Sequence, residues 1–178
     1  MPAADPHRGT GWAAAEVASR VMVHQGSSRS GVAAVAATIW CGSFACLHLF
    51  WALGGSFGLA SSAGRDLAAR RPASFVIFGL YGAALLLVIG TAIIAVTQRP
   101  RAGRRRRRAA SVLLAVVGVG LVLRGVVLEV LLATNSAGLR KNVGPVETHW
   151  SLILWNPWFA AGGALFIATA IRASRARS

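Results

Sequence analysis

Four apolar stretches, near residues 32–53, 74–97, 110–133 and 150–171, constrain the fold of this chain more than any other feature. Each is long enough to form a transmembrane helix, which needs about 20 apolar residues. Of the 178 residues, 55% are hydrophobic and only 13% are charged, which leaves too little polar surface for a soluble domain. Because the connecting loops are short, the sequence predicts an all-α polytopic membrane protein, an antiparallel bundle of four transmembrane helices.

The segments outside the apolar stretches are polar or basic. Residues 1–30 contain Asp5, Glu16 and scattered arginines before any apolar segment begins, which is unlike a secretory signal peptide. We therefore expect a disordered cytoplasmic tail over 1–30, a membrane domain over 31–172, and a basic tail over 173–178.

The formal net charge of +14 is distributed unequally among the loops. Thirteen of the 19 Lys and Arg residues precede the first stretch, follow the fourth, or lie between the second and third. Five lie in the other two loops, and Arg124 lies within the third stretch. Since Lys and Arg stay on the cytoplasmic side, we expect an inner-membrane protein with both termini cytoplasmic. No aromatic residues interrupt Arg104–Arg108, so we expect this run to contact lipid headgroups and not nucleic acid.

Several classes of enzyme are excluded by the motifs that the chain lacks. Cys41 and Cys46 are five residues apart, on helix faces about 140° apart, and cannot bridge each other. The sequence contains no C-x-x-C pair, no phosphate-binding loop, no H-E-x-x-H and no G-x-S-x-G. We therefore expect no metal site and no cofactor.

Small residues in the third and fourth stretches predict close helix packing. Gly118, Val122, Gly125 and Glu129 recur at three- and four-residue spacing and share one helix face. Residues 160–164 form a comparable patch of alanines and glycines. Glycine on such a face lets a neighbouring membrane helix approach closely.

Polar side chains from all four stretches fall at a similar depth in the outer half of the membrane. At 1.5 Å per residue, His48, Tyr81, Glu129 and Asn156 lie roughly 6–10 Å below the outer surface, and Arg124 roughly 13 Å. A charged side chain near the centre of a bilayer costs about 2.5–3.5 kcal/mol on insertion scales, so such residues mark candidate sites. The candidate catalytic residues are His48, Glu129 and His149. The candidate ligand-binding residues are Trp51, Tyr81, Arg124, Trp155 and Asn156.

The partners of the two ionisable groups in the third stretch are expected on other helices. Arg124 and Glu129 are five residues apart, about 140° around the helix, which disfavours direct pairing. Pro157 has no N–H to donate, so the carbonyl of Ile153 loses its helical partner and adds a polar notch beside Asn156. Trp51, Trp150 and Trp155 have two interpretations, an aromatic belt at the headgroups or an apolar wall for a ligand.

Two motifs are familiar together: H-x-x-W-A-L-G-G at 48–55 and W-N-P-W-F-x-x-G-G at 155–163. The chain resembles, over roughly 32–172, an uncharacterised family of small four-span bacterial membrane proteins, domain of unknown function 3995. The resemblance implies the four-span architecture and no particular chemistry.

The sequence thus predicts an integral membrane protein with a polar pocket in the outer half of the bundle. The pocket would bind a lipid-like or other small hydrophobic molecule, and His48 with Glu129 or His149 could catalyse a proton-transfer isomerisation. Two alternatives stay open: a dimeric proton-coupled transporter that uses Glu129, and a structural or assembly protein without a ligand. The expected partners are membrane lipids, a hydrophobic small molecule and a second copy of the chain.

Overall fold

The structure is a computed structural model, which describes the backbone of residues 11–175 and the side chains of residues 31–175 apart from Ala137 and Asn142. No strand occurs within residues 11–175. The long helices are α1 (Gly11–Ala52), α4 (Gly82–Gln98), α5 (Arg104–Ala133) and α8 (Asn156–Arg175). The short elements are α2 (Leu59–Ala63), α3 (Arg65–Arg70), the π-helix η2 (Phe75–Tyr81), the 3-10 helix η3 (Ser136–Gly138), α6 (Leu139–Val143), α7 (Pro145–Trp150) and the π-helix η4 (Ser151–Trp155).

Four helical segments in the described part of the chain are long and apolar enough to cross a membrane: Gly31–Ala52, Phe75–Gln98, Arg104–Ala133 and Pro145–Arg175. The prediction of an all-α, multi-pass membrane protein is confirmed. The third helix begins earlier than the expected apolar stretch, because the arginines that precede it are good helix formers and continue the same helix.

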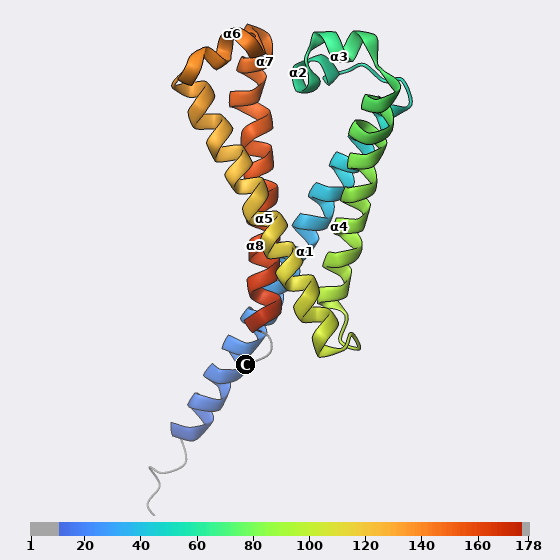
Figure 1. The fold of residues 1–178 in the computed structure, drawn as a ribbon. Coiled ribbons are helices and arrows are strands. Elements are labelled where there is room, and N and C mark those ends of the chain that lie inside the picture. The colour runs from blue at the N-terminus through green and yellow to red at the C-terminus, as the bar shows by residue number, and fades with distance from the viewer. Residues whose placement is uncertain (1–10, 176–178) are drawn as a thin grey trace, which may run out of the picture.

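The long helices form two pairs that diverge toward one end of the molecule. Successive long helices run in alternate directions, with α1 beside α4 and α5 beside α8 (Figure 1). The pairs are closest in their lower halves and separate toward the end that carries α2, α3, α6 and α7, here called the loop end. The opposite end, here called the arginine end, carries the start of α5.

The N-terminal segment differs from the expected tail in its backbone. Residues 1–10 lie outside the described part of the chain, so the expectation of disorder is not addressed there. From Gly11 the backbone is helical and forms the first part of α1, which projects beyond the other helices at the arginine end (Figure 1).

The contact between α5 and α8 is a seam of backbone against backbone. A Cβ atom added to Gly118 would lie 2.8 Å from the carbonyl oxygen of Gly163, and one added to Gly163 would lie 2.5 Å from that of Gly118. Nearer the loop end, a Cβ atom on Gly125 would lie 2.7 Å from the carbonyl oxygen of Asn156. The predicted packing of the two small-residue faces is confirmed, since no side chain larger than hydrogen fits at these positions.

The contact between α1 and α8 uses an aromatic side chain against a glycine. The indole of Trp40 covers Gly162, where an added Cβ atom would lie 2.3 Å from the ring. Trp40 Nε1 donates a hydrogen bond to the carbonyl oxygen of Trp158, 3.1 Å away. This bond satisfies a polar group that would otherwise be buried without a partner.

Two helices open into π-helical turns on the side of the loop end. In η4 the N–H of Asn156 bonds to the carbonyl oxygen of Ser151, five residues earlier, and in η2 the N–H of Gly82 bonds to Ile77 in the same way. The widened turn in η4 immediately precedes Pro157, whose missing N–H disrupts the ordinary i to i−4 pattern. The polar notch expected at Pro157 therefore takes the form of a change in helical register.

Two arginines of the short connections bind the carbonyl ends of long helices. Arg71 donates to the carbonyl oxygens of Trp51, at 2.9 Å, and of Gly55. Arg140 donates through Nε to Leu132 and through Nη2 to Ala133, at 2.6 and 2.7 Å. A cation at a helix C-terminus satisfies unpaired carbonyls and complements the helix dipole, so these charges stabilise the ends of α1 and α5.

Candidate functional site

An apolar cavity of about 480 Å³ lies between the two helix pairs. All four long helices contribute to its wall, and His48 is its one titratable group. The lining residues are Trp40, Phe44 and His48 of α1; Ala83, Leu86, Leu87, Ile89, Gly90 and Ile93 of α4; Leu113, Leu114, Val117 and Leu121 of α5; and Phe159 and Phe166 of α8. Cavities of this size with few polar groups are typical of sites for hydrophobic small molecules.

Some of the side chains of α4 and α5 that line the cavity are also exposed on the outside of the molecule. Leu86 is 68% exposed, and Ile89 and Leu113 are also exposed, although all three line the cavity. Each of these residues lies within a segment that is long and apolar enough to cross a membrane. In a membrane, these exposed side chains would face the hydrocarbon region.

His48 lies on the face of α1 whose aromatic side chains, Trp40 and Phe44, line the cavity. Its Nδ1 is 2.9 Å from the carbonyl oxygen of Phe44, one turn earlier. A carbonyl oxygen only accepts hydrogen bonds, so Nδ1 carries the proton and, in the neutral ring, Nε2 is an acceptor. The imidazole also makes edge contacts with Phe44, at 4.5 Å between ring centroids, and with Trp51, at 5.2 Å.

The side chains around His48 form a continuous aromatic wall. Phe44 packs against Phe159 with 5.6 Å between ring centroids, and against Trp155 at 6.4 Å. Trp40 packs against Phe166 at 5.8 Å. Edge and offset contacts of this kind are favourable beyond the burial of area alone, so α1 and α8 hold the wall in place.

Arg124 lies beside the same wall. Its guanidinium carbon is 3.7 Å from the centroid of the Phe159 ring, within the range of a cation–π contact. On α5, Val117, Leu121 and Arg124 follow at three- and four-residue spacing, so Arg124 continues the face that lines the cavity by one turn toward the loop end. Among the described residues, no hydrogen-bond acceptor contacts its guanidinium. Inserting a charged side chain into a membrane in an apolar segment costs free energy when no hydrogen-bond acceptor offsets it.

Glu129 and Asn156 belong to the seam between α5 and α8 and do not line the cavity. Asn156 Nδ2 donates to Glu129 Oε2 at 3.1 Å, and Asn156 is only 3% exposed. The partner of Glu129 is thus on another helix, as its spacing from Arg124 predicts. No ion pair joins Glu129 to Arg124, and no hydrogen bond joins it to His48, within the described side chains. The expected ring of polar groups is divided between two places.

Trp51 and Trp155 are buried in the protein and bind the first loop. Trp51 Nε1 donates to the carbonyl oxygen of Phe57 at 2.7 Å, and Trp155 Nε1 donates to that of Ser61 at 3.0 Å. Both also line a second cavity of about 630 Å³ near the loop end. Trp150 lines that cavity as well but is 40% exposed. Burial of Trp51 and Trp155 disfavours an exposed aromatic belt for these two residues.

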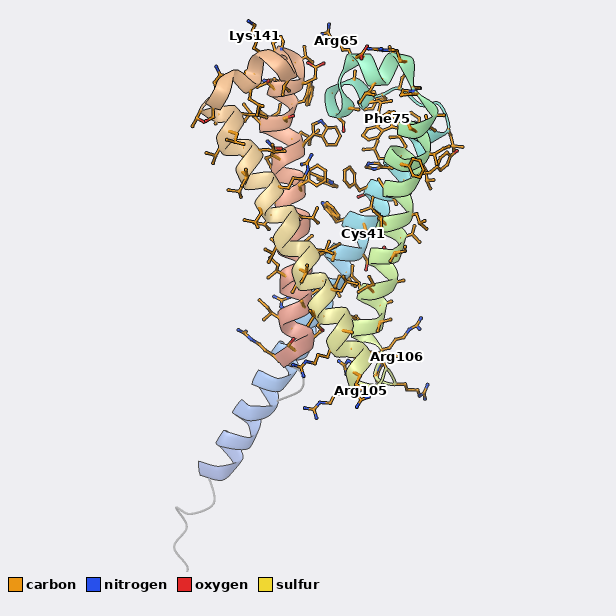
Figure 2. The ribbon with its side chains drawn as sticks, viewed as in Figure 1. Cys41, Arg65, Phe75, Arg105, Arg106 and Lys141 are labelled. Atoms are coloured by element: carbon orange, nitrogen blue, oxygen red, sulfur yellow. The ribbon has the colours of Figure 1, made fainter. Side chains whose placement is uncertain are left out.

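The two remaining candidates lie away from the first cavity. Tyr81 is 41% exposed at the end of η2 and does not line the cavity. His149 contacts the ring of Trp150 and lines a surface depression of about 510 Å³ beside Arg140 and Lys141. Figure 2 shows Lys141 at the loop end on the arm formed by α5 and α8. His149 therefore lies in a depression separate from the cavity that His48 lines.

Three residues that the sequence analysis did not select form much of the site: Trp40, Phe44 and Phe159. Trp40, Phe44 and His48 are spaced four residues apart and share one face of α1, which was the available signal. Across the described residues, no group of three or more His, Cys, Asp or Glu side chains could hold a metal ion.

A family model described as "Protein of unknown function (DUF3995)" matches residues 40–166, well over half of the chain, and the chain belongs to this family. The match contains both tryptophan motifs and most of the four-helix region, and it omits the first part of α1 and the last turns of α8. No curated protein and no solved structure matches the chain.

Proposed function

We propose that this member of the DUF3995 family binds an amphipathic, lipid-like molecule in the cavity between its helix pairs. The apolar part of the ligand would occupy the cavity, and a carboxylate, phosphate or carbonyl group would bind Arg124. The observation that carries the proposal is the position of this guanidinium, which lies against Phe159 of the cavity wall; Arg124 is itself exposed and has no acceptor among the described residues. An acidic headgroup would provide the missing charge-assisted hydrogen bonds.

The arrangement of the polar groups favours binding over a purely structural role. A network that only fixes helix register would join His48, Arg124 and Glu129 by hydrogen bonds and leave no cavity between the helices. In the described residues these three are not joined, and a cavity of about 480 Å³ lies beside His48. Glu129 and Asn156 are hydrogen-bonded to each other between α5 and α8. This bond can fix the register of the two helices without His48 or Arg124.

His48 would provide the one acceptor inside the cavity. Nε2 of its neutral ring could accept a hydrogen bond from a hydroxyl group of the ligand. Proton transfer by His48 with Glu129 or His149 stays a prediction, because neither partner lines the same cavity. The dimeric transporter also stays a prediction, and the binding proposal depends on neither.

The charges of the connections support an orientation in the membrane. Arginine is concentrated at the end where α5 begins: in the connection between α4 and α5, in the first turns of α5 and in the last turn of α8. By the positive-inside rule this end would face the cytoplasm, with the loop end outside and the protein in the cytoplasmic membrane. The headgroup of the ligand would then lie in the outer half of the membrane, since Arg124 is in the half of α5 nearer the loop end, and the apolar part would extend toward the middle of the span.

The proposal is tested by fluorescence titration of the detergent-purified protein with dansyl-labelled undecanoic acid and with its methyl ester. We expect the wild type to bind the acid about tenfold more tightly than the ester, because a charge-assisted hydrogen bond contributes about 1.5–3 kcal/mol. Arg124→Gln should remove this preference, Arg124→Lys should keep part of it, and Arg99→Gln should have no effect.

Gel filtration of each variant reports whether it folds. A monodisperse Arg124→Gln protein that still prefers the acid would contradict the assigned headgroup site. Wild-type protein that binds neither probe would contradict ligand binding in the cavity and favour a structural role.

A further inference from the structure

A groove lies at the arginine end, between the start of α5 and the end of α8. Its volume is about 670 Å³. Arg104 and Arg108 of α5 and Arg175 of α8 line its outer part. Val112, Ala115 and Ile171 line the part deeper in the span. The groove therefore changes from cationic to apolar along its length.

The sequence of α5 places this change on one helix face. Arg104, Arg108, Ser111 and Ala115 follow at three- and four-residue spacing, so their side chains are stacked along the same side of the helix. At 1.5 Å per residue, Ala115 lies roughly 16 Å along the helix from Arg104. That length suits a molecule with an anionic head and an apolar chain, and it is too long and too apolar for a free inorganic anion.

The start of α5 has a positive potential that no residue of its own first turn offsets. Its N-cap is Gly103, no side chain caps the helix, and its first turn contains no acidic residue. The N–H groups of the first turn have no partner within the helix, and the positive end of the helix dipole is at the same place. Five consecutive arginines, Arg104–Arg108, add to this potential and destabilise the helix end unless an anion is bound.

We propose that this groove binds an anionic phospholipid. The phosphate would lie between Arg104 and Arg108 at the start of α5, with Arg175 on the α8 side. One acyl chain would follow Val112 and Ala115 into the membrane. This site lies at the opposite end of the molecule from His48 and Arg124, and it does not depend on the function proposed for the cavity.

The chain contains a matched control for this proposal. Arg105 and Arg106 belong to the same run, but neither lines the groove, and Figure 2 shows both extending from the beginning of α5. Replacing either pair by glutamine removes the same charge from the same run of five residues. If the lipid were held only by general attraction to the basic residues, both replacements would lower its affinity equally. A site in the groove would lose affinity only when Arg104 and Arg108 are replaced.

The test is native mass spectrometry of the full-length protein in detergent, with added dioleoylphosphatidylglycerol or dioleoylphosphatidylcholine. We expect the wild type to retain the anionic lipid preferentially. Arg104→Gln with Arg108→Gln should lower its affinity about 25-fold, because each arginine near an anionic lipid contributes about fivefold. Arg105→Gln with Arg106→Gln should change it less than about twofold, and Arg104→Lys with Arg108→Lys should retain most of it.

Two further probes identify the source of the anion. Dihexanoylphosphatidylglycerol has the same headgroup with short chains and should bind more weakly, and inorganic phosphate should neither bind nor displace the long-chain lipid. Equal losses of lipid affinity in the two glutamine double variants would show that the attraction is non-specific and would overturn the proposal. Displacement of the lipid by inorganic phosphate would overturn it in favour of a soluble anion.

Discussion

The seam between α5 and α8 and the cleft between the helix pairs are built from opposite kinds of residue. In the seam, Gly118 and Gly163 bring two backbones into contact and leave no space for a methyl group. In the cleft, large aromatic side chains such as Phe44 and Phe159 pack against each other and form part of the wall of a cavity of about 480 Å³. The seam therefore holds α5 and α8 in a fixed arrangement, whereas the cleft leaves a cavity between the helix pairs.

Polar groups follow the same division. Asn156 and Glu129 are hydrogen-bonded to each other within the seam, where Asn156 is buried and Glu129 is half-buried. His48 and Arg124, beside the cleft, contact aromatic rings and retain unused hydrogen-bonding capacity. Satisfied polar groups fix the arrangement of helices, whereas unsatisfied ones beside a cavity are candidates for contact with a ligand.

The largest expected effect is from breaking the seam. Gly118→Val should destabilise the protein by about 3 kcal/mol or prevent folding, because the new side chain would overlap the backbone of α8. Gly120→Val on the same helix is the control, since no atom lies within 4 Å of its added Cβ. Unfolding in increasing SDS, followed by circular dichroism, measures both. Similar stability of the two variants would show that the seam is looser than described.

The next effect concerns the hydrogen bond in the seam. Asn156→Ala should destabilise the protein by about 2 kcal/mol, because Glu129 would keep a half-buried carboxylate without its donor. Adding Glu129→Leu should restore part of this loss by removing the unpaired group. The same SDS titration measures the double-mutant cycle, and strictly additive losses would argue against a direct interaction.

A smaller effect is expected where α5 ends at the loop end. Arg140→Gln should lower stability by about 1 kcal/mol, since its guanidinium binds the carbonyls of Leu132 and Ala133. Lys141→Gln removes the same charge from the neighbouring residue and should change the melting temperature little. Equal shifts in the two thermal melts would assign the effect to net charge and not to helix capping.

The smallest effect on stability is expected in the cleft. Ala83→Phe places a large apolar side chain into existing space, so the free energy of unfolding should change by about 0.5 kcal/mol or less. Binding of dansyl-labelled undecanoic acid should nevertheless fall about tenfold, because the cavity is filled. Ala92→Phe, at an exposed position of the same helix, should leave binding unchanged. Loss of binding in both variants would contradict the assignment of the cavity.

Much of the architecture could be predicted from the sequence because it depends on local rules. Span length follows from hydropathy and the rise of a helix. The seam follows from the face that Gly118 and Gly125 share, since only small residues permit such contact. The register change before Pro157 was predicted in part, as a lost hydrogen bond, but the π-turn that replaces it depends on the surrounding packing.

The site was harder to predict, for a physical reason. Residues that line the cavity, such as Leu87 and Val117, are of the same type as residues that face lipid, so hydropathy does not separate them. Depth along each helix can be calculated from residue number, and it placed His48 and Glu129 at one level. Rotation about the helix axis relative to the neighbours cannot be calculated in this way. That rotation directs Glu129 into the seam and His48 into the cleft.

The most direct test of the account is to photo-crosslink a diazirine-bearing fatty acid to the protein in a bilayer and to map the labelled residues by mass spectrometry. The account predicts label on cavity residues, Phe44, Leu87 and Phe159 above all, with a marked loss in Ala83→Phe and none in Ala92→Phe. Label spread equally over exposed positions such as Leu85 and Leu123, and unchanged in Ala83→Phe, would contradict it.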